Sequence, residues 1–306
     1  MKVGAQQPVA PSAKPEPPAR LSLAEIAIYK KAPTLIEWTA SQVRDSSDLR
    51  KIQPAESQDQ LPEILDRVGQ ACARLFGDFP KVHCEEDVVS SASLEGAPPP
   101  HSKADDWVVS ASRGREFRYT VIPDSTGDVP TFTEYRTDPG GYPIDAARLK
   151  DFPMVTSAYA SSFLYFSQAD QHDSRYRYFG TEMIRKRQCY VVGFAQDPDK
   201  ARRFEEFTFL GKDKVLLLLQ GLAWVDAKTF QILRVRSWLL APRTDIHLDS
   251  QTITVDFFPA AKSETRKMVW MPREATVETH CRGYKVRNTH EYSNFQLFRV
   301  ESIIKP

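Results

Sequence analysis

Residues 214–242, KVLLLLQGLAWVDAKTFQILRVRSWLLAP, decide the fold class because they predict two long strands joined by a short loop. Both flanks are rich in β-branched and aromatic residues, which favour strands. Asp226-Ala227-Lys228-Thr229 is the predicted turn, since an Asp side chain can bond to the backbone of its own turn. The stretch holds no nucleophile, base or metal-ligand set, so it predicts an architecture and no activity.

Strand patterns continue on both sides of this hairpin. Alternation of apolar and polar residues predicts strands at 83–91, 107–124, 131–137, 175–184, 188–196, 251–258, 273–281 and 284–300. In the second of these, Phe117, Tyr119 and Val121 share one face. About ten strands in succession predict a meandering antiparallel sheet that is too wide to remain flat.

The predicted fold is therefore mainly β (α+β), a large curved antiparallel half-barrel with two or three helices in or against its concave face. Residues 1–20 are rich in Pro and Ala and predict a disordered tail, and residues 21–56 predict a short helical extension. Residues 57–306 form one predicted domain. Its helices are expected at about 57–78, where apolar residues recur at helical spacing, and at 146–167, which also fits a strand.

Composition excludes several classes of protein. The 306 residues are 41% hydrophobic and 26% charged, which suits a soluble globular core. Lys and Arg number 41 and Asp and Glu 40, so the net charge of +1 gives no footprint of a nucleic-acid binder. The longest apolar run begins at Val215 and is about half the ~20 residues that a transmembrane helix needs. The sequence predicts neither a nucleic-acid partner nor a transmembrane segment.

The cysteines and histidines predict no metal site. The chain has four cysteines, too scattered for a disulfide scaffold or a CxxC site: Cys72, Cys84, Cys189 and Cys281. One disulfide, for instance between Cys84 and Cys281, and a set of buried thiols both stay open. His83 and His280 each precede a cysteine, but neighbours on a strand point to opposite faces, so each pair offers at most one inward ligand.

Charged clusters are interpreted as solvated surface. Glu85-Glu86-Asp87 and Asp105-Asp106 could serve acid–base chemistry, but each run lies beside a loop, where solvated charge is the ordinary explanation. Seven arginines could bind an anionic polymer, or could cover the sheet and pair with acidic residues: Arg113, Arg115, Arg118, Arg175, Arg177, Arg185 and Arg187. No nucleotide-binding, hydrolase or zinc-protease motif occurs. No catalytic residue and no cofactor is predicted.

Aromatic residues suggest a binding cavity. Concave apolar surfaces are the usual ligand sites. The residues expected to line such a cavity are Phe152, Tyr159, Phe163, Phe166, Trp224 and Trp238. Most of the aromatic side chains are expected to be ordinary core.

Two resemblances sharpen these expectations. LAWVDAKTFQILRVRS and GTEMIRKRQCYVVGFA resemble the repeated strand–turn–strand pattern of the periplasmic lipoprotein-carrier and lipoprotein-sorting half-barrels (LolA/LolB-like). TLIEWTASQV, FPKVHCEEDV and NTHEYSNFQLFRVE, among other segments, resemble uncharacterised secreted proteins of Acidobacteria. The resemblance implies an exported protein and brings no catalytic residues. The Pro/Ala-rich start lacks the apolar stretch of a signal peptide, although such a leader often follows one after cleavage. Either the protein is cytoplasmic, or Met1 is not the native start.

The sequence therefore supports one main hypothesis and one alternative. The first is a non-enzymatic periplasmic or secreted protein that binds a hydrophobic ligand, such as a lipid or acyl chain, or a lipidated partner. The alternative is a protein-interaction or envelope-stress sensing module whose concavity is filled by its own helix and whose partner is an envelope protein. The sequence does not predict the ligand or the oligomeric state.

Overall fold

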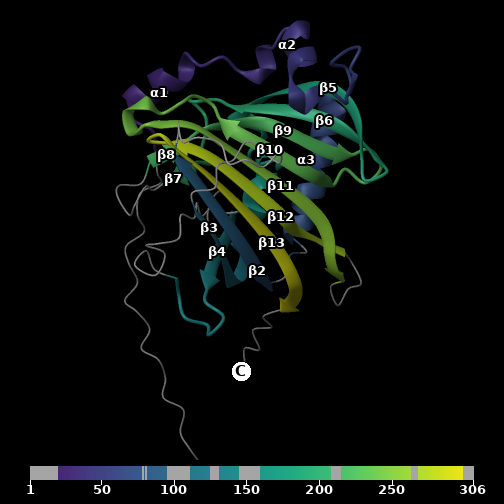
Figure 1. The fold of residues 1–306 in the computed structure, drawn as a ribbon. Coiled ribbons are helices and arrows are strands. Elements are labelled where there is room, and N and C mark those ends of the chain that lie inside the picture. The colour runs from purple at the N-terminus through teal and green to yellow at the C-terminus, as the bar shows by residue number, and fades with distance from the viewer. Residues whose placement is uncertain are drawn as a thin grey trace, which may run out of the picture.

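The computed structural model describes residues 20–77, 79, 81–94, 111–124, 131–144, 159–207, 215–262 and 268–298 (Figure 1). Its α-helices and 3-10 helices (η) are α1 Leu23–Lys30, η1 Leu35–Glu37, α2 Ala40–Asp45, η2 Ser47–Leu49, α3 Leu61–Gly77, η3 Ala160–Phe166, η4 Gln171–Asp173 and η5 Thr244–Ile246. Its strands are β1 Gln53–Pro54, β2 Lys81–Leu94, β3 Ala111–Asp124, β4 Thr131–Thr137, β5 Ser174–Ile184, β6 Arg187–Gln196, β7 Glu205–Phe207, β8 Val215–Leu217, β9 Leu219–Asp226, β10 Ile232–Leu239, β11 Leu248–Lys262, β12 Met268–Cys281 and β13 Tyr284–Phe298. Across these residues, no helix combines the length and the hydrophobicity of a membrane span.

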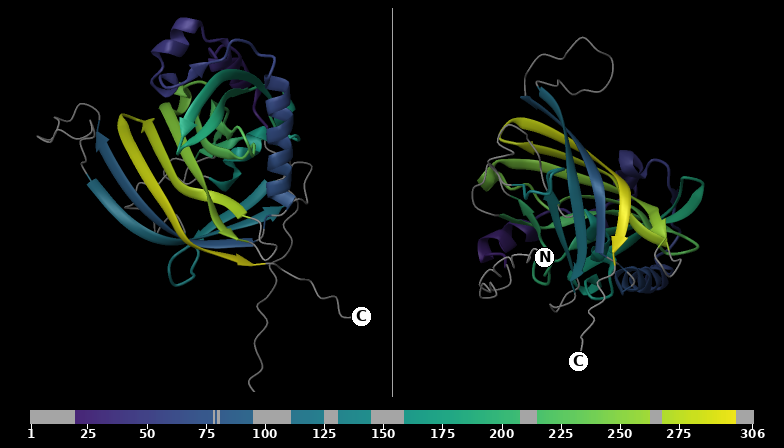
Figure 2. Two further views of the ribbon diagram at one scale, coloured as in Figure 1. Left: turned by 90° about the vertical axis from the view of Figure 1, so that its right-hand side faces the viewer. Right: turned by 90° about the horizontal axis from the view of Figure 1, so that it is seen from below.

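Within the described residues, one sheet of 11 strands dominates the molecule, in the order β1-β5-β6-β9-β10-β11-β12-β13-β2-β3-β4. Neighbouring strands are antiparallel throughout. The sheet curls strongly, and it is not closed, because β1 and β4 lie at its two edges (Figure 2). The predicted large, curved antiparallel sheet is confirmed.

The β9–β10 connection forms as the sequence predicts. One carboxylate oxygen of Asp226 accepts hydrogen bonds from the backbone N–H of Lys228 (3.0 Å) and from the backbone N–H (2.8 Å) and hydroxyl (3.0 Å) of Thr229. Its other oxygen accepts from Arg187 of β6 at 2.5 Å. Asp226 therefore holds the turn together and ties it to the neighbouring strand.

The concave face carries the larger core. On α3, Ile64, Val68 and Cys72 are buried, at the three- and four-residue spacing of an amphipathic helix. On η3, Phe163 and Phe166 are buried as well, and both helices share one cluster with inward-facing side chains of the sheet. Residues 146–158 of the helix expected at 146–167 lie outside the described part of the chain, as do residues 1–19 of the expected tail.

A second core covers the opposite, convex face of β5, β6, β9 and β10. The N-terminal segment α1–η2 packs there, outside the curl of the sheet (Figure 2), and buries Tyr29, Leu35, Val43 and Leu49. Polar contacts fix it, since Arg177 of β5 donates to the carbonyl oxygens of Ile36 (3.1 Å) and Trp38 (2.5 Å). The central strand β9 is consequently buried on both faces.

Candidate functional site

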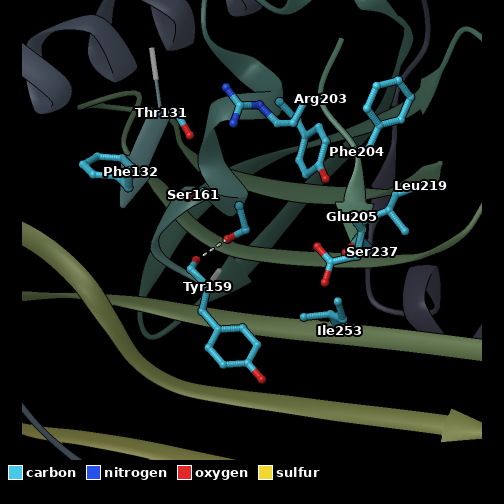
Figure 3. A pocket seen from close by; sticks show the side chains of 12 residues that line it. Thr131, Phe132, Tyr159, Ser161, Arg203, Phe204, Glu205, Leu219, Ser237 and Ile253 are labelled. Atoms are coloured by element: carbon cyan, nitrogen blue, oxygen red, sulfur yellow. Dashed lines mark hydrogen bonds between the residues drawn. The ribbon is translucent and has the colours of Figure 1, made fainter. Parts of the chain in front are cut away.

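A pocket of about 140 Å³ lies on the concave side, between η3, the start of β4 and the strands β9–β11 (Figure 3). The segment that leads into β7 completes its walls. The lining residues are Thr131, Phe132, Tyr159, Ser161, Ser162, Tyr165, Arg203, Phe204, Glu205, Leu219, Ser237 and Ile253. Apolar and hydroxyl-bearing side chains therefore share the surface of this pocket.

The charged groups at the pocket come from the segment that leads into β7. Arg203 donates from its Nε (3.2 Å) and from a terminal nitrogen (2.9 Å) to Asp170, which lies just beyond η3. Tyr165 of η3 stacks on Phe194 of β6 at 5.0 Å, and burial raises the pKa of its hydroxyl. The C-terminal end of η3 is thus fixed to the wall of the pocket by stacking and by the ion pair behind it.

Glu134 of β4 holds the other end of η3. Its carboxylate accepts hydrogen bonds from the backbone N–H of Ala160 (3.1 Å), and from the N–H (3.0 Å) and hydroxyl (2.6 Å) of Ser161. Burial raises the pKa of Glu134 to about 7, although the Ser161 and Ala160 donors and the charge of Arg136 each lower it. A residue on an edge strand therefore fixes the first turn of the helix that lines the pocket.

A buried polar network lies behind Tyr159. Arg136 of β4 pairs with both carboxylate oxygens of Glu86 of β2, at 2.5 and 2.8 Å. Glu86 is also 2.9 Å from Nδ1 of His290 on β13, and Nε2 of His290 is 3.0 Å from the Tyr159 hydroxyl. The Arg136 guanidinium lies 5.6 Å from the centre of the Tyr159 ring. Three strands and η3 meet in this network.

The network holds one anion, the Glu86 carboxylate, and one cation, the Arg136 guanidinium. Burial alone would raise the pKa of Glu86, but Arg136 and His290 outweigh it and lower the value to about 2. Burial lowers the pKa of His290 despite its contact with Glu86, so the ring is neutral at pH 7. Glu86 is accordingly an ionised partner of Arg136 inside the core.

The row Glu86, His290, Tyr159 has the order of a carboxylate–imidazole–hydroxyl relay. Its geometry permits a proton to pass along the row. However, Glu86 and His290 are 0% exposed and Tyr159 is 1% exposed, and the Tyr159 hydroxyl is turned towards His290. The arrangement orients Tyr159 at the pocket wall and links η3 to the sheet.

The structure separates the residues expected to line a cavity. Tyr159, Phe163 and Phe166 belong to the concave core, and Tyr159 lines the pocket. Trp224 and Trp238 belong to the convex cluster under the N-terminal segment. Phe152 lies outside the described residues. The structure therefore places part of the predicted set at the pocket and part on the other side of the sheet.

Four residues of the site were not predicted: Glu86, Glu134, Arg136 and His290. Glu86 was interpreted as part of a solvated acidic run, and this is wrong, because only Glu85 and Asp87 are exposed while Glu86 is buried. Strand alternation could have revealed it, since Glu86 shares its face with the buried Cys84 and Val88.

The other candidate clusters take structural roles. Arg175 pairs with Glu37 (2.8 Å), Arg185 with Asp256 (2.6 Å) and Arg187 with Asp226 (2.5 Å), so these arginines serve ion pairs. All four cysteines are buried with free thiols. No group of metal-binding side chains gathers anywhere in the described residues.

Comparison with known proteins gives similarity at the level of solved structures. The chain matches no protein-family model, and a search of curated proteins finds no match either. An outer membrane lipoprotein-sorting protein domain from Vibrio parahaemolyticus shares 11% identity, covering 79% of this chain and 93% of that one, with a TM-score of 0.41. A DUF1329 family protein from Desulfovibrio piger shares 12% sequence identity, covering 81% of this chain and 95% of that one, with a TM-score of 0.40. A LolA superfamily protein from Nitrosomonas europaea shares 14% identity, covering 79% of this chain and 96% of that one, with a TM-score of 0.34. Similarity of this degree concerns the fold alone.

Proposed function

We propose that this chain is a non-enzymatic binding protein that holds a hydrophobic ligand, or the lipid group of a lipidated partner, on its concave side. The observation that carries the proposal is the pocket between η3 and β9–β11. Leu219 and Ile253 offer it an apolar wall, and the Ser237 hydroxyl offers a hydrogen bond. The hydroxyls of Ser161 and Ser162 already donate to Glu134 and to the Tyr159 carbonyl, so they offer a ligand only their acceptor oxygens. An apolar wall with a few polar groups is typical of small-molecule sites.

The size of the pocket limits what it accepts without rearrangement. Ligand pockets usually measure about 300–1,000 Å³, whereas this one measures about 140 Å³. A short chain or ring fits as the pocket stands. A longer acyl chain needs more space than this pocket offers, and we propose that η3, whose Ser161, Ser162 and Tyr165 line it, moves when such a chain binds.

We further propose that the protein works in the periplasm or outside the cell. This part of the proposal rests on the sequence resemblance to exported half-barrel proteins and to secreted proteins of Acidobacteria. Detection of the mature chain in the periplasmic or culture fraction of its source would support it, and exclusive recovery from the cytoplasm would contradict it.

Filling the pocket should abolish binding. In Ser237→Leu, a larger apolar side chain on β10 enters the pocket, and we expect the affinity for the uncharged fluorescent probe N-phenyl-1-naphthylamine to fall about tenfold or more, a change of about 1.4 kcal/mol. Fluorescence titration measures it. Ser250→Leu makes the same change at an exposed position of β11 and should bind the probe as the wild type does.

Two outcomes would contradict this function. The first is a wild-type protein that takes up neither the probe nor any lipid extracted from bacterial envelopes. The second is an affinity that is equal in Ser237→Leu and Ser250→Leu, both shown to be folded by their melting transitions. Probe binding that is lost only in Ser237→Leu would support it.

One observation favours the interaction module as a second candidate. An open hollow of about 630 Å³ lies along β2, β3 and the residues that come after β4, and Val88, Val89 and Ile144 are among its lining residues. Val89 of β2 is 51% exposed, and Tyr142, in the segment after β4 that also contains Ile144, is 64% exposed. Exposed apolar side chains of this kind often mark partner-binding surfaces. Loss of partner capture in Val89→Asp, with probe binding intact, would identify this candidate.

A further inference from the structure

The position of Glu134 couples the helix at the pocket to a titratable group. Ser161 both lines the pocket and donates two hydrogen bonds to Glu134, one from its N–H and one from its hydroxyl. The third donor, the N–H of Ala160, belongs to the same turn. A larger ligand that gains its room by displacing this turn separates η3 from Glu134.

We propose that Glu134 is a proton-linked latch: it holds η3 over the pocket while it carries a proton, and displacement of η3 by a ligand exposes the carboxyl to water and releases that proton. The inference rests on the proposed function, because the latch regulates the same pocket. It predicts that ligand affinity rises with pH.

The physical reason is the difference in environment between the two states. In the closed state, burial raises the pKa of Glu134 to about 7. In the open state the carboxyl meets water, where it titrates near the ordinary value of 4.5. A group with the lower pKa in the open state favours that state as the pH rises between the two values, because opening then releases a proton. Below both values the linkage disappears.

The neighbouring charges do not replace Glu134 in this role. Arg136, two residues further along β4, lowers the pKa of Glu134, but its guanidinium donates to both carboxylate oxygens of Glu86 of β2. His290 of β13 is on the far side of Glu86, and Val121, the partner of Glu134 on β3, is apolar. The charged side chains among the lining residues of the pocket are Arg203 and Glu205. Among the described residues, no cation forms an ion pair with Glu134.

The test compares probe binding at two pH values. N-phenyl-1-naphthylamine has three aromatic rings, more than the single ring that the pocket accepts as it stands, so its binding tests the displacement of η3. It carries no charge in this range, so its own titration does not interfere. For the wild type we expect an affinity about tenfold higher at about pH 8 than at about pH 5.5. In Glu134→Gln, which imitates the uncharged carboxyl and keeps one of its two acceptor oxygens, we expect the low affinity at both values. Glu116→Gln, at an exposed position of β3, should behave as the wild type does.

A second measurement keeps the latch testable if Glu134→Gln does not fold or the probe does not bind. Hydrogen exchange of the Ala160 and Ser161 amides in the wild type, corrected for base catalysis, should show less protection at the higher pH. Equal affinity and equal protection at both values would overturn the latch and leave the proposed function in place. Absence of binding of both the probe and the envelope lipids, together with pH-dependent protection, would support the latch and contradict the proposed function.

Discussion

Arg136→Met is expected to lower the free energy of unfolding by about 3–5 kcal/mol, because it leaves the Glu86 carboxylate buried without its cation. Glu86 is 0% exposed, and Arg136 supplies two of its hydrogen bonds. Methionine fills similar volume, so the loss reports the charge rather than a cavity. Urea denaturation monitored by tryptophan fluorescence measures the difference.

The matched control is Arg118→Met on the neighbouring strand β3, where the side chain is exposed and the expected change is within about 0.5 kcal/mol. A double variant, Arg136→Met with Glu86→Gln, should recover part of the loss, since it removes both charges. Equal stability of Arg136→Met and Arg118→Met would show that the pair contributes nothing to the fold. A double variant less stable than the sum of the single variants would also contradict this account.

The loss of stability at acid pH depends on the same pair, Glu86 and Arg136. The pKa of Glu86 lies at about 2 in the folded protein and at 4.5 when unperturbed. A carboxyl whose pKa is lowered by folding stabilises the folded state above its unfolded value, and this contribution disappears as the pH falls from about 4.5 towards 2. Arg136→Met should therefore remove part of the stability that the wild type loses over this range.

The sheet was predictable because its information is local. Two-residue alternation and turn chemistry act within a few residues, so the Asp226 turn and the strands next to it form where the sequence predicts them. The start of the first predicted strand does not join this hairpin, because Val215–Leu217 forms β8, which pairs with β7 in a separate sheet. The network was less accessible. Glu86 and His290 are 204 positions apart, and no local pattern shows that β2 and β13 lie side by side. The sequence shows only that Glu86 lies on the inward face of its own strand, because it alternates with Glu85 and Asp87.

The tryptophans show a different limit. Every residue of β9 is buried, so alternation along that strand does not reveal which face a side chain takes. Both faces are buried because the segment α1–η2 covers the outer one, and this covering depends on contacts between residues far apart in the sequence. An aromatic set chosen from the sequence therefore mixed the two faces.

Trp224→Ala is expected to lower the free energy of unfolding by about 3–5 kcal/mol and to leave ligand uptake unchanged. Trp224 is 3% exposed in the convex cluster, and its indole N–H donates to Glu182 at 2.7 Å. The substitution creates a cavity beneath the N-terminal segment and leaves Glu182 without this donor. Thermal melting measures the first expectation, and titration with N-phenyl-1-naphthylamine measures the second, because the indole lies across the sheet from the pocket.

Trp238→Ala provides the comparison. Trp238 is half-buried and stacks on Trp38 at 6.4 Å between ring centres, so its loss should cost only about 1–2 kcal/mol. Both variants should bind the probe with wild-type affinity, in contrast to Ser237→Leu. A folded Trp224→Ala protein with unchanged melting but altered uptake would place Trp224 at the ligand rather than in the convex core. Equal and large losses of stability in both variants would show instead that the N-terminal segment comes off the sheet as one unit.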